Sequence, residues 1–295
     1  MNSQAKELID GITVVIPAFN EQGSIGRTIE EIKEILLKIN LDSEIIVIDD
    51  CSNDDTLKML KNSSVKYFCH EYNQGYGASL KTGIKHAKYE TVVITDADGT
   101  YPNNRIPDLV KHMETGGYDM VVGSRTGEKV KVPLLRRIPK WILNKLANYL
   151  ANTKIPDINS GLRIMKKAHI KRFDNILPDG FSFTTTITLA MMTNNMRVNY
   201  IPINYYRRIG KSKIRPFYDT LNFLQLIIRT ILYFNPLKVF IPFSGMLIIL
   251  AVFILLMSRF FLGRAMDVTF GTIMMTAVIV LAIGLLADLI DKRLG

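Results

Sequence analysis

Short apolar runs alternate with amphipathic segments along the first two-thirds of the chain. Apolar, mostly β-branched runs that end at proline, glycine or acidic residues predict buried strands at residues 12–16, 44–50, 65–69, 91–95 and 119–123. Between them, apolar residues at helical spacing predict helices at 25–39, 55–61 and 73–87. This alternation predicts an α/β fold, with a mostly parallel sheet and helices on both of its faces.

The pattern is weaker between residues 124 and 206. A basic, proline-punctuated segment at 129–140 is predicted to be a loop that leads into a helix ending near residue 152. Residues 164–165 and 199–206 have the composition of strands. The threonine-rich segment 181–192 fits a helix and a strand about equally well.

The composition changes sharply after residue 215. Residues 217–234 carry an apolar face with few charges, which is typical of an amphipathic helix in the membrane interface. Two further segments, 236–258 and 268–290, are almost wholly apolar and about long enough to cross a bilayer. A buried core hairpin is the alternative, but both segments are too long and too uniformly apolar for it. We therefore predict a soluble domain at 1–215, an interfacial helix at 216–235 and two transmembrane helices.

Charge predicts the orientation of the chain in a membrane. Two crossings place the soluble domain and both termini on one side of the bilayer. Cations at 207–215, with Lys292 and Arg293, indicate that this side is the cytoplasm, although Arg259 and Arg264 between the two spans weaken the contrast. The prediction is an integral membrane protein with a cytoplasmic domain and cytoplasmic termini.

The charge and composition of the chain restrict the kinds of binding partner that we expect. A formal net charge of +10 and a pI of about 9.5 indicate a polyanionic partner, such as nucleic acid, a phosphorylated substrate or a membrane surface. Nucleic acid is disfavoured because the excess charge lies beside the membrane segments. The four histidines and two cysteines lack zinc-site spacing, and Cys51 and Cys69 are expected to be reduced thiols.

The acidic pair Asp96 and Asp98 follows the predicted strand at 91–95, just before Gly99. Ligand sites of open α/β sheets lie at the carboxyl ends of their strands. Two carboxylates this close repel each other unless a cation lies between them, and Mg²⁺ or Mn²⁺ carrying a diphosphate would be such a cation. A polar turn without any metal is the alternative. A dinucleotide-binding oxidoreductase is disfavoured, because Pro17 occupies the place where a G-x-G-x-x-G turn would begin.

Six motifs, in this order and spacing, resemble the family 2 glycosyltransferases of GT-A fold. They are VIPAFNE at 15–21, VIDD at 47–50, NQGYG at 73–77, DAD at 96–98, VGSR at 122–125 and RIGKSK at 208–213. The likeness is greatest to the polyprenyl-phosphate glycosyltransferases and includes the C-terminal membrane hairpin. It implies a GT-A (Rossmann-like) domain that uses Mg²⁺ or Mn²⁺.

The resemblance also implies roles for individual residues. The residues that would bind the nucleotide sugar are Pro17, Phe19, Glu21, Asp49, Asp50, Asp96, Ala97, Asp98, Arg208 and Lys213. Asp96 and Asp98 would hold the metal, while Thr100, where many relatives have glutamine, is left out of the metal set. Arg125, Arg136 and Arg137 would bind the acceptor phosphate, and the basic segment 129–140 is either a phosphate-binding lid or a solvated loop. The implied catalytic residues are Asp98, Arg125 and Asp157, where Asp157 is a base, an orienting carboxylate or the cap of the turn at 160–163.

The implied reaction is the inverting transfer of one sugar from UDP-glucose, UDP-N-acetylglucosamine or GDP-mannose to dolichyl or undecaprenyl phosphate. Trp141 is the only tryptophan and is not part of the Gln-x-x-Arg-Trp motif typical of processive synthases, so single transfer is favoured. Transfer to a glycan or glycolipid hydroxyl and an inactive membrane scaffold are the alternatives. The sequence leaves open whether the chain forms a homo-oligomer.

Overall fold

The computed structural model forms two compact units, residues 1–226 and residues 227–295, which we describe separately. The residues that it describes are 9–127, 145, 148, 149, 153–180, 182–206, 225, 232, 235–261 and 266–294. The predicted interfacial helix at 216–235 and the basic segment at 129–140 therefore lie outside the described residues, apart from residues 225, 232 and 235.

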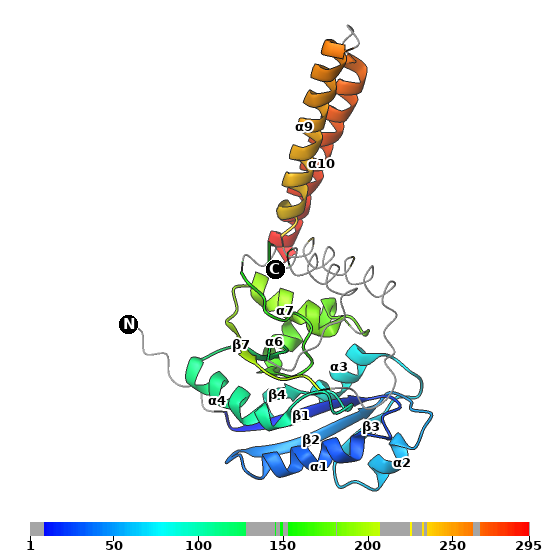
Figure 1. The fold of residues 1–295 in the computed structure, drawn as a ribbon, viewed down its shortest axis with the longest axis vertical. Coiled ribbons are helices and arrows are strands. Elements are labelled where there is room, and N and C mark those ends of the chain that lie inside the picture. The colour runs from blue at the N-terminus through cyan, green and yellow to red at the C-terminus, as the bar shows by residue number, and fades with distance from the viewer. Residues whose placement is uncertain are drawn as a thin grey trace. The chain divides into compact units, whose positions relative to one another are not determined.

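A mixed, mostly parallel sheet forms the centre of the first unit (Figure 1). Its strands are β1 (Gly11–Ala18), β2 (Asp42–Asp49), β3 (Lys66–Cys69), β4 (Thr91–Ile94), β5 (Met120–Ser124), β6 (Arg163–Lys166) and β7 (Val198–Pro202). They lie in the order β3-β2-β1-β4-β6-β5-β7. Strand β6 runs antiparallel to β4 and β5, and every other pairing is parallel. The predicted mostly parallel α/β sheet is confirmed.

Helices cover both faces of this sheet. They are α1 (Ile25–Leu36), α2 (Thr56–Lys61), α3 (Tyr76–His86), α4 (Ile106–Gly116), α6 (Lys167–Arg172) and α7 (Phe183–Thr193), with short 3₁₀ turns η1 (Asn103–Arg105) and η3 (Asp174–Ile176). On one face, apolar residues of α1 and α4 pack on β1 side chains such as Ile12 and Val14. On the other face, Gly83 of α3 lies against Val15 and Ile48, and Figure 1 shows α1 and α3 on opposite sides of the sheet.

Some predicted elements are shorter in the structure, and the one ambiguous segment is a helix. The helix predicted at 25–39 ends at Leu36, and the strand predicted at 199–206 ends at Pro202, which has no N–H to continue a ladder. The ambiguous segment 181–192 is the helix α7, in which every residue from Phe183 to Met191 is buried. Because no face of α7 is solvated, its sequence has no amphipathic period to identify it.

The described residues of the second unit include two long helices, α9 (Leu237–Phe261) and α10 (Asp267–Leu294). The segments Leu237–Phe261 and Asp267–Ile290 are long and apolar enough to cross a membrane, and they overlap the predicted spans at 236–258 and 268–290. The Ser244 hydroxyl donates to the Ala277 carbonyl at 2.8 Å, and both residues are buried. The two helices therefore pack closely against each other, as helices in lipid do through small residues.

Candidate active site

A cavity of about 470 Å³ opens at the edge of the sheet where the parallel strands end. This volume suits a small-molecule ligand. The lining residues come from the segments that follow β1, β2, β4, β5 and β7, from the start of α3, from the turn before β6 and from α7. They are Pro17, Ala18, Phe19, Glu21, Asp50, Asn73, Gly75, Tyr76, Ser79, Asp96, Ala97, Asp98, Tyr101, Arg125, Asn159, Gly161, Thr184 and Tyr205.

One end of the cavity is formed by the segments after β1 and β2. Pro17, Phe19 and Glu21 line it, and the buried Glu21 carboxylate accepts a hydrogen bond from the Ser24 hydroxyl at 3.2 Å. The Asp50 carboxylate is held in place by several contacts. Its carboxylate accepts the main-chain N–H groups of Gln74 and Gly75 at 2.8 and 2.9 Å and contacts His70 Nδ1 at 2.7 Å.

Neighbouring Asp49 is placed differently from Asp50. It ends β2, is 1 % exposed, and is not among the residues that line the cavity. Its Oδ2 accepts the main-chain N–H of Ser52 at 3.3 Å. Successive residues of an extended chain point to opposite sides, so only one member of this acidic pair reaches the cavity.

Asp96 and Asp98 line the middle of the cavity, after β4. Asp98 is 6 % exposed, and its Oδ1 accepts the main-chain N–H of Thr100 at 3.1 Å and the Thr100 hydroxyl at 2.6 Å. The Tyr76 hydroxyl donates to Asp96 Oδ1 at 3.0 Å. Burial and the nearby Asp96 carboxylate raise the pKa of Tyr76, so the phenol keeps its proton and remains a donor.

This pair of carboxylates fits a hard divalent cation. Among the described residues, no group of three or more His, Cys, Asp or Glu side chains could hold a metal. Mg²⁺, however, is usually held by one or two carboxylates together with substrate phosphates and water. A Cβ on Gly161 would lie 2.8 Å from Asp96 Oδ1, so a residue without a side chain is needed for the turn before β6 to approach the Asp96 carboxylate this closely.

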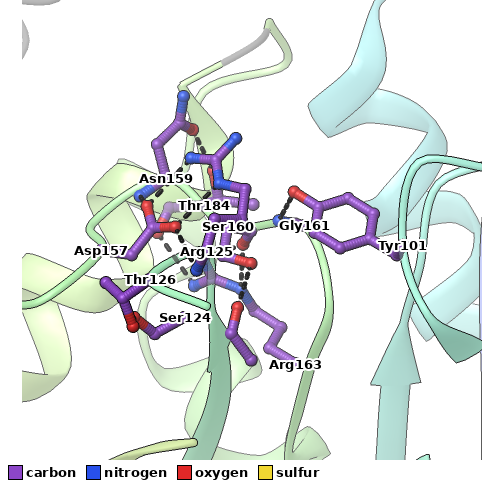
Figure 2. A network of polar contacts seen from close by, with 11 residues as sticks. Tyr101, Ser124, Arg125, Thr126, Asp157, Asn159, Ser160, Gly161, Arg163 and Thr184 are labelled. Atoms are coloured by element: carbon purple, nitrogen blue, oxygen red, sulfur yellow. Dashed lines mark hydrogen bonds and ion pairs between the residues drawn. The ribbon is translucent and has the colours of Figure 1, made fainter. Parts of the chain in front are cut away.

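Arg125 and Asp157 form a paired group at the far end of the cavity (Figure 2). Arg125 Nε and Nη2 donate to the two oxygens of Asp157 at 2.7 and 2.9 Å. Burial opposes the charge on Arg125, but the neighbouring Tyr101 phenol and Asp157 outweigh it and raise the pKa of Arg125 above its ordinary value. Arg125 lines the cavity, whereas Asp157 lies behind it, 4 % exposed.

Arg163, at the start of β6, ties the turn at 157–161 to α7. It is fully buried, and its Nε and Nη2 donate to the Ser160 carbonyl. Its Nη1 donates to the Thr184 carbonyl at 3.0 Å and to the Thr188 hydroxyl at 2.9 Å. Because these acceptors are uncharged, they compensate only partly for the hydration that the guanidinium loses. Burial therefore lowers the pKa of Arg163.

The glycines of the NQGYG motif allow a close backbone approach. Gly77 N–H and Ala78 N–H at the start of α3 donate to the carbonyls of Gly180 and Asp179 at 3.2 and 2.9 Å. A Cβ on Gly77 would collide with the Pro178 carbonyl, and Gly75 has a φ of +103°. The start of α3 therefore supports the segment that leads into α7. The N–H groups of Gly77 and Ala78 are already hydrogen-bonded to protein carbonyls.

The structure thus brings together Pro17, Phe19, Glu21, Asp50, Asp96, Ala97, Asp98 and Arg125 of the predicted site around one cavity. Arg136, Arg137, Arg208 and Lys213 lie outside the described residues. Five further lining residues were not predicted from the sequence: Tyr76, Tyr101, Asn159, Thr184 and Tyr205. Asn159 lies within the sequence Asp157–Arg163 that drew attention for its aspartate, whereas Thr184 belongs to the segment whose structure was ambiguous.

Comparison with known proteins identifies a family and several relatives of this chain. The family model described as glycosyl transferase family 2 matches residues 13–173. An uncharacterized protein of Methanocaldococcus jannaschii is 32 % identical over 68 % of this chain and 84 % of its own length. A dolichyl-phosphate hexose transferase of Haloferax volcanii is 27 % identical over 70 % of this chain and 88 % of its own. An undecaprenyl-phosphate mannosyltransferase of Micrococcus luteus is 24 % identical over 69 % and 87 %.

The fold has solved counterparts. Glucosyl-3-phosphoglycerate synthase from Mycobacterium tuberculosis, in complex with Mn²⁺, UDP-glucose and phosphoglyceric acid, superimposes with a TM-score of 0.59. The match covers 75 % of this chain and 80 % of the synthase at 18 % sequence identity. At this identity the likeness establishes the shared fold and no more.

Proposed function

This chain belongs to glycosyl transferase family 2, and we propose that it transfers a single sugar, with inversion, from a nucleotide sugar to a polyprenyl phosphate at the cytoplasmic membrane face. One observation carries the proposal. The same cavity is lined by the carboxylates of Asp96 and Asp98 and by the guanidinium of Arg125. A site with a cation-binding centre and a separate anion-binding side chain suits a reaction between two phosphorylated molecules.

The carboxylates would serve the donor. Asp96 and Asp98 would hold Mg²⁺ or Mn²⁺, which would supply charge neutralisation for the departing nucleoside diphosphate. Pro17, Phe19, Glu21 and Asp50 would enclose the base and ribose, and Arg208 and Lys213 would contact the donor phosphates. The solved synthase supports this use of the fold, since its complex contains Mn²⁺ and UDP-glucose.

Arg125 would serve the acceptor. A guanidinium with a raised pKa stays charged at every physiological pH, and its fork binds phosphate oxygens with defined geometry. Asp157 uses both carboxylate oxygens on Arg125, which favours the role of orienting carboxylate over that of base. A phosphate is already ionised at neutral pH, so an acceptor of this kind does not require a base. Arg136 and Arg137 would add to the same phosphate site.

Two features support a lipid acceptor. The helices α9 and α10 are long and apolar enough to cross a membrane. The relatives from Haloferax volcanii and Micrococcus luteus are named for dolichyl-phosphate and undecaprenyl-phosphate substrates. An anchored domain meets a lipid head group in the plane of the interface, where effective concentrations are high.

The proposal is tested with membranes that contain the full chain. They are incubated with labelled UDP-glucose, UDP-N-acetylglucosamine or GDP-mannose and with dolichyl or undecaprenyl phosphate. We expect one donor to give a lipid-linked monosaccharide, and we expect Arg125→Ala to raise the KM for the lipid phosphate by at least about tenfold, because a charged hydrogen-bond donor is lost. Arg27→Ala, which removes an exposed arginine of α1, is the matched control. Transfer to a hydroxyl acceptor instead, or no lipid product from any donor, would refute the proposal.

A further inference from the structure

We propose that Asn159 and Thr184 form the subsite that binds a hydroxyl group of the transferred sugar. This inference rests on the proposed function, because it assumes that the cavity holds a nucleotide sugar. It assigns a role to two lining residues that the reaction described above does not use.

The order of the strands places the sugar beside these residues. A nucleotide sugar is a linear molecule in which the diphosphate separates the nucleoside from the sugar. In the proposed function the nucleoside lies at the segments after β2 and β1 and the diphosphate at the segment after β4, and these three strands are neighbours in the sheet. The strand next to β4 is β6, and the turn immediately before β6 supplies Asn159 to the cavity. The sugar therefore meets the wall that Asn159 shares with Thr184.

The two side chains are already oriented toward each other (Figure 2). The Thr184 hydroxyl donates to Asn159 Oδ1 at 2.7 Å. With the amide oxygen bonded to Thr184, the amide nitrogen of Asn159 is the group that would donate to a ligand in the cavity that Asn159 lines. The oxygen of Thr184 keeps lone pairs that can accept a hydrogen bond.

Arg163 holds both partners in place. It bonds the carbonyl of Ser160, which follows Asn159, and the carbonyl of Thr184 itself. The main-chain N–H of Asn159 is fixed as well, since it donates to Asp157 Oδ1 at 3.2 Å. A pair whose rotamers are set before binding loses little entropy when the ligand arrives.

The chemistry of the wall suits a neutral hydroxyl. One donor from Asn159 and one acceptor at Thr184 match a group that both accepts and donates a hydrogen bond. Among the described residues, the carboxylates that line the cavity are Glu21, Asp50, Asp96 and Asp98, and all of them lie on the segments after β1, β2 and β4. Arg125 is assigned to the acceptor phosphate, so the sugar is left with the neutral pair Asn159 and Thr184. The expected contact at this pair is therefore with a hydroxyl group of a hexose.

The test compares a nucleoside diphosphate with its sugar conjugate. Binding of UDP, UDP-glucose, GDP and GDP-mannose in the presence of Mn²⁺ is measured by calorimetry on the purified full chain in detergent. We expect Asn159→Ala and Asn159→Asp to weaken the preferred nucleotide sugar by about tenfold, the effect of one lost hydrogen bond, and to change the parent diphosphate by less than about twofold. The exposed Asn104→Ala is the matched control.

Variants of Thr184 separate contact from packing. Thr184→Val keeps the shape and removes the hydroxyl, so it should weaken the nucleotide sugar and act non-additively with Asn159→Ala. Thr184→Ser should recover most of that loss. Equal weakening of diphosphate and nucleotide sugar in Asn159→Ala would overturn the inference, as would no effect on either, provided that thermal unfolding shows the variants folded.

The two proposals fail differently. If the wild type binds a nucleotide sugar with the expected dependence on Asn159 but makes no lipid-linked product, the acceptor assignment is wrong and the subsite stands. If the lipid product forms and Asn159→Ala binds the donor normally, the subsite is wrong and the function stands. A wild type that binds none of the four nucleotides would refute both.

Discussion

Arg125 and Asp157 are joined by three hydrogen bonds, two from the guanidinium and one from the main-chain N–H of Arg125 to the same carboxylate. Asp157 is nearly buried, whereas a fifth of the Arg125 side chain is exposed. Buried pairs of this kind owe their value to geometry more than to net stabilisation. The pair presents one charged group to the cavity in a fixed direction.

This relationship predicts the outcome of Asp157→Asn. The amide keeps the shape of the carboxylate but replaces one acceptor oxygen with an NH₂ group that faces the guanidinium. We expect the KM for the lipid phosphate to rise by about tenfold, from the loss of a charge-assisted pair, with no change in the shape of the pH profile of kcat. Steady-state kinetics between pH 5.5 and pH 9 would check this. Loss of the acidic limb of that profile in the variant would instead identify Asp157 as a general base.

The acidic pair predicts dependence on a divalent cation. Chelation by EDTA should abolish transfer, and Mg²⁺ or Mn²⁺ should restore it in the wild type. Asp98→Ala should stay folded in membranes and should not respond to either ion, because it has lost half of the carboxylate pair. Asp10→Ala, an exposed carboxylate ahead of β1, is the control. Full activity of Asp98→Ala would show that the metal assignment is wrong.

The contact between α3 and the segment before α7 predicts a difference between two glycines. In Gly77→Ala the new methyl group collides with the Pro178 carbonyl, whereas a Cβ on Gly180 has no atom within 4 Å. We expect Gly77→Ala to lower the free energy of unfolding by about 1–3 kcal/mol, the usual cost of overpacking, and Gly180→Ala to be nearly neutral. Thermal unfolding of both variants measures this. Equal free energies of unfolding for the two variants would mean that the close backbone approach at Gly77 does not contribute to stability.

The buried arginine predicts a larger loss. In Arg163→Met the carbonyls of Ser160 and Thr184 lose a donor inside the protein. Each unsatisfied buried acceptor costs about 1–3 kcal/mol, so the variant should unfold several degrees below the wild type. Arg172→Met, in which the lost arginine makes an exposed contact with Asn194, is the control. Similar melting temperatures for the two variants would contradict the inference that the hydrogen bonds of Arg163 to Ser160 and Thr184 stabilise the fold.

The sequence pattern was sufficient for β1, β2, β4 and β5, because each is a short, buried, mostly apolar run with a defined stop. Ile94 is followed by a polar segment that Gly99 interrupts, and this placed Asp96 and Asp98 at the sheet edge. Asp49 and Asp50 are adjacent in the sequence, and only the twist and ending of β2 determine which one lines the cavity. Thr184 could not be found because α7 is buried on all sides. The burial of Arg163 could not be predicted, because its acceptors on Thr184 and Thr188 are supplied by tertiary contacts with α7.

The position of β6 in the sheet also affects the order in which the walls of the cavity are assembled during synthesis. Strands β1 to β4 form adjacent parallel pairs from the first part of the chain, whereas β6 must insert between β4 and β5. Strand β6 begins at Arg163, about 70 residues after β4 ends at Ile94, so it is synthesised after β1 to β4 are complete. A nascent chain can thus assemble the segments that line the nucleoside end before the wall that contains Asn159 exists.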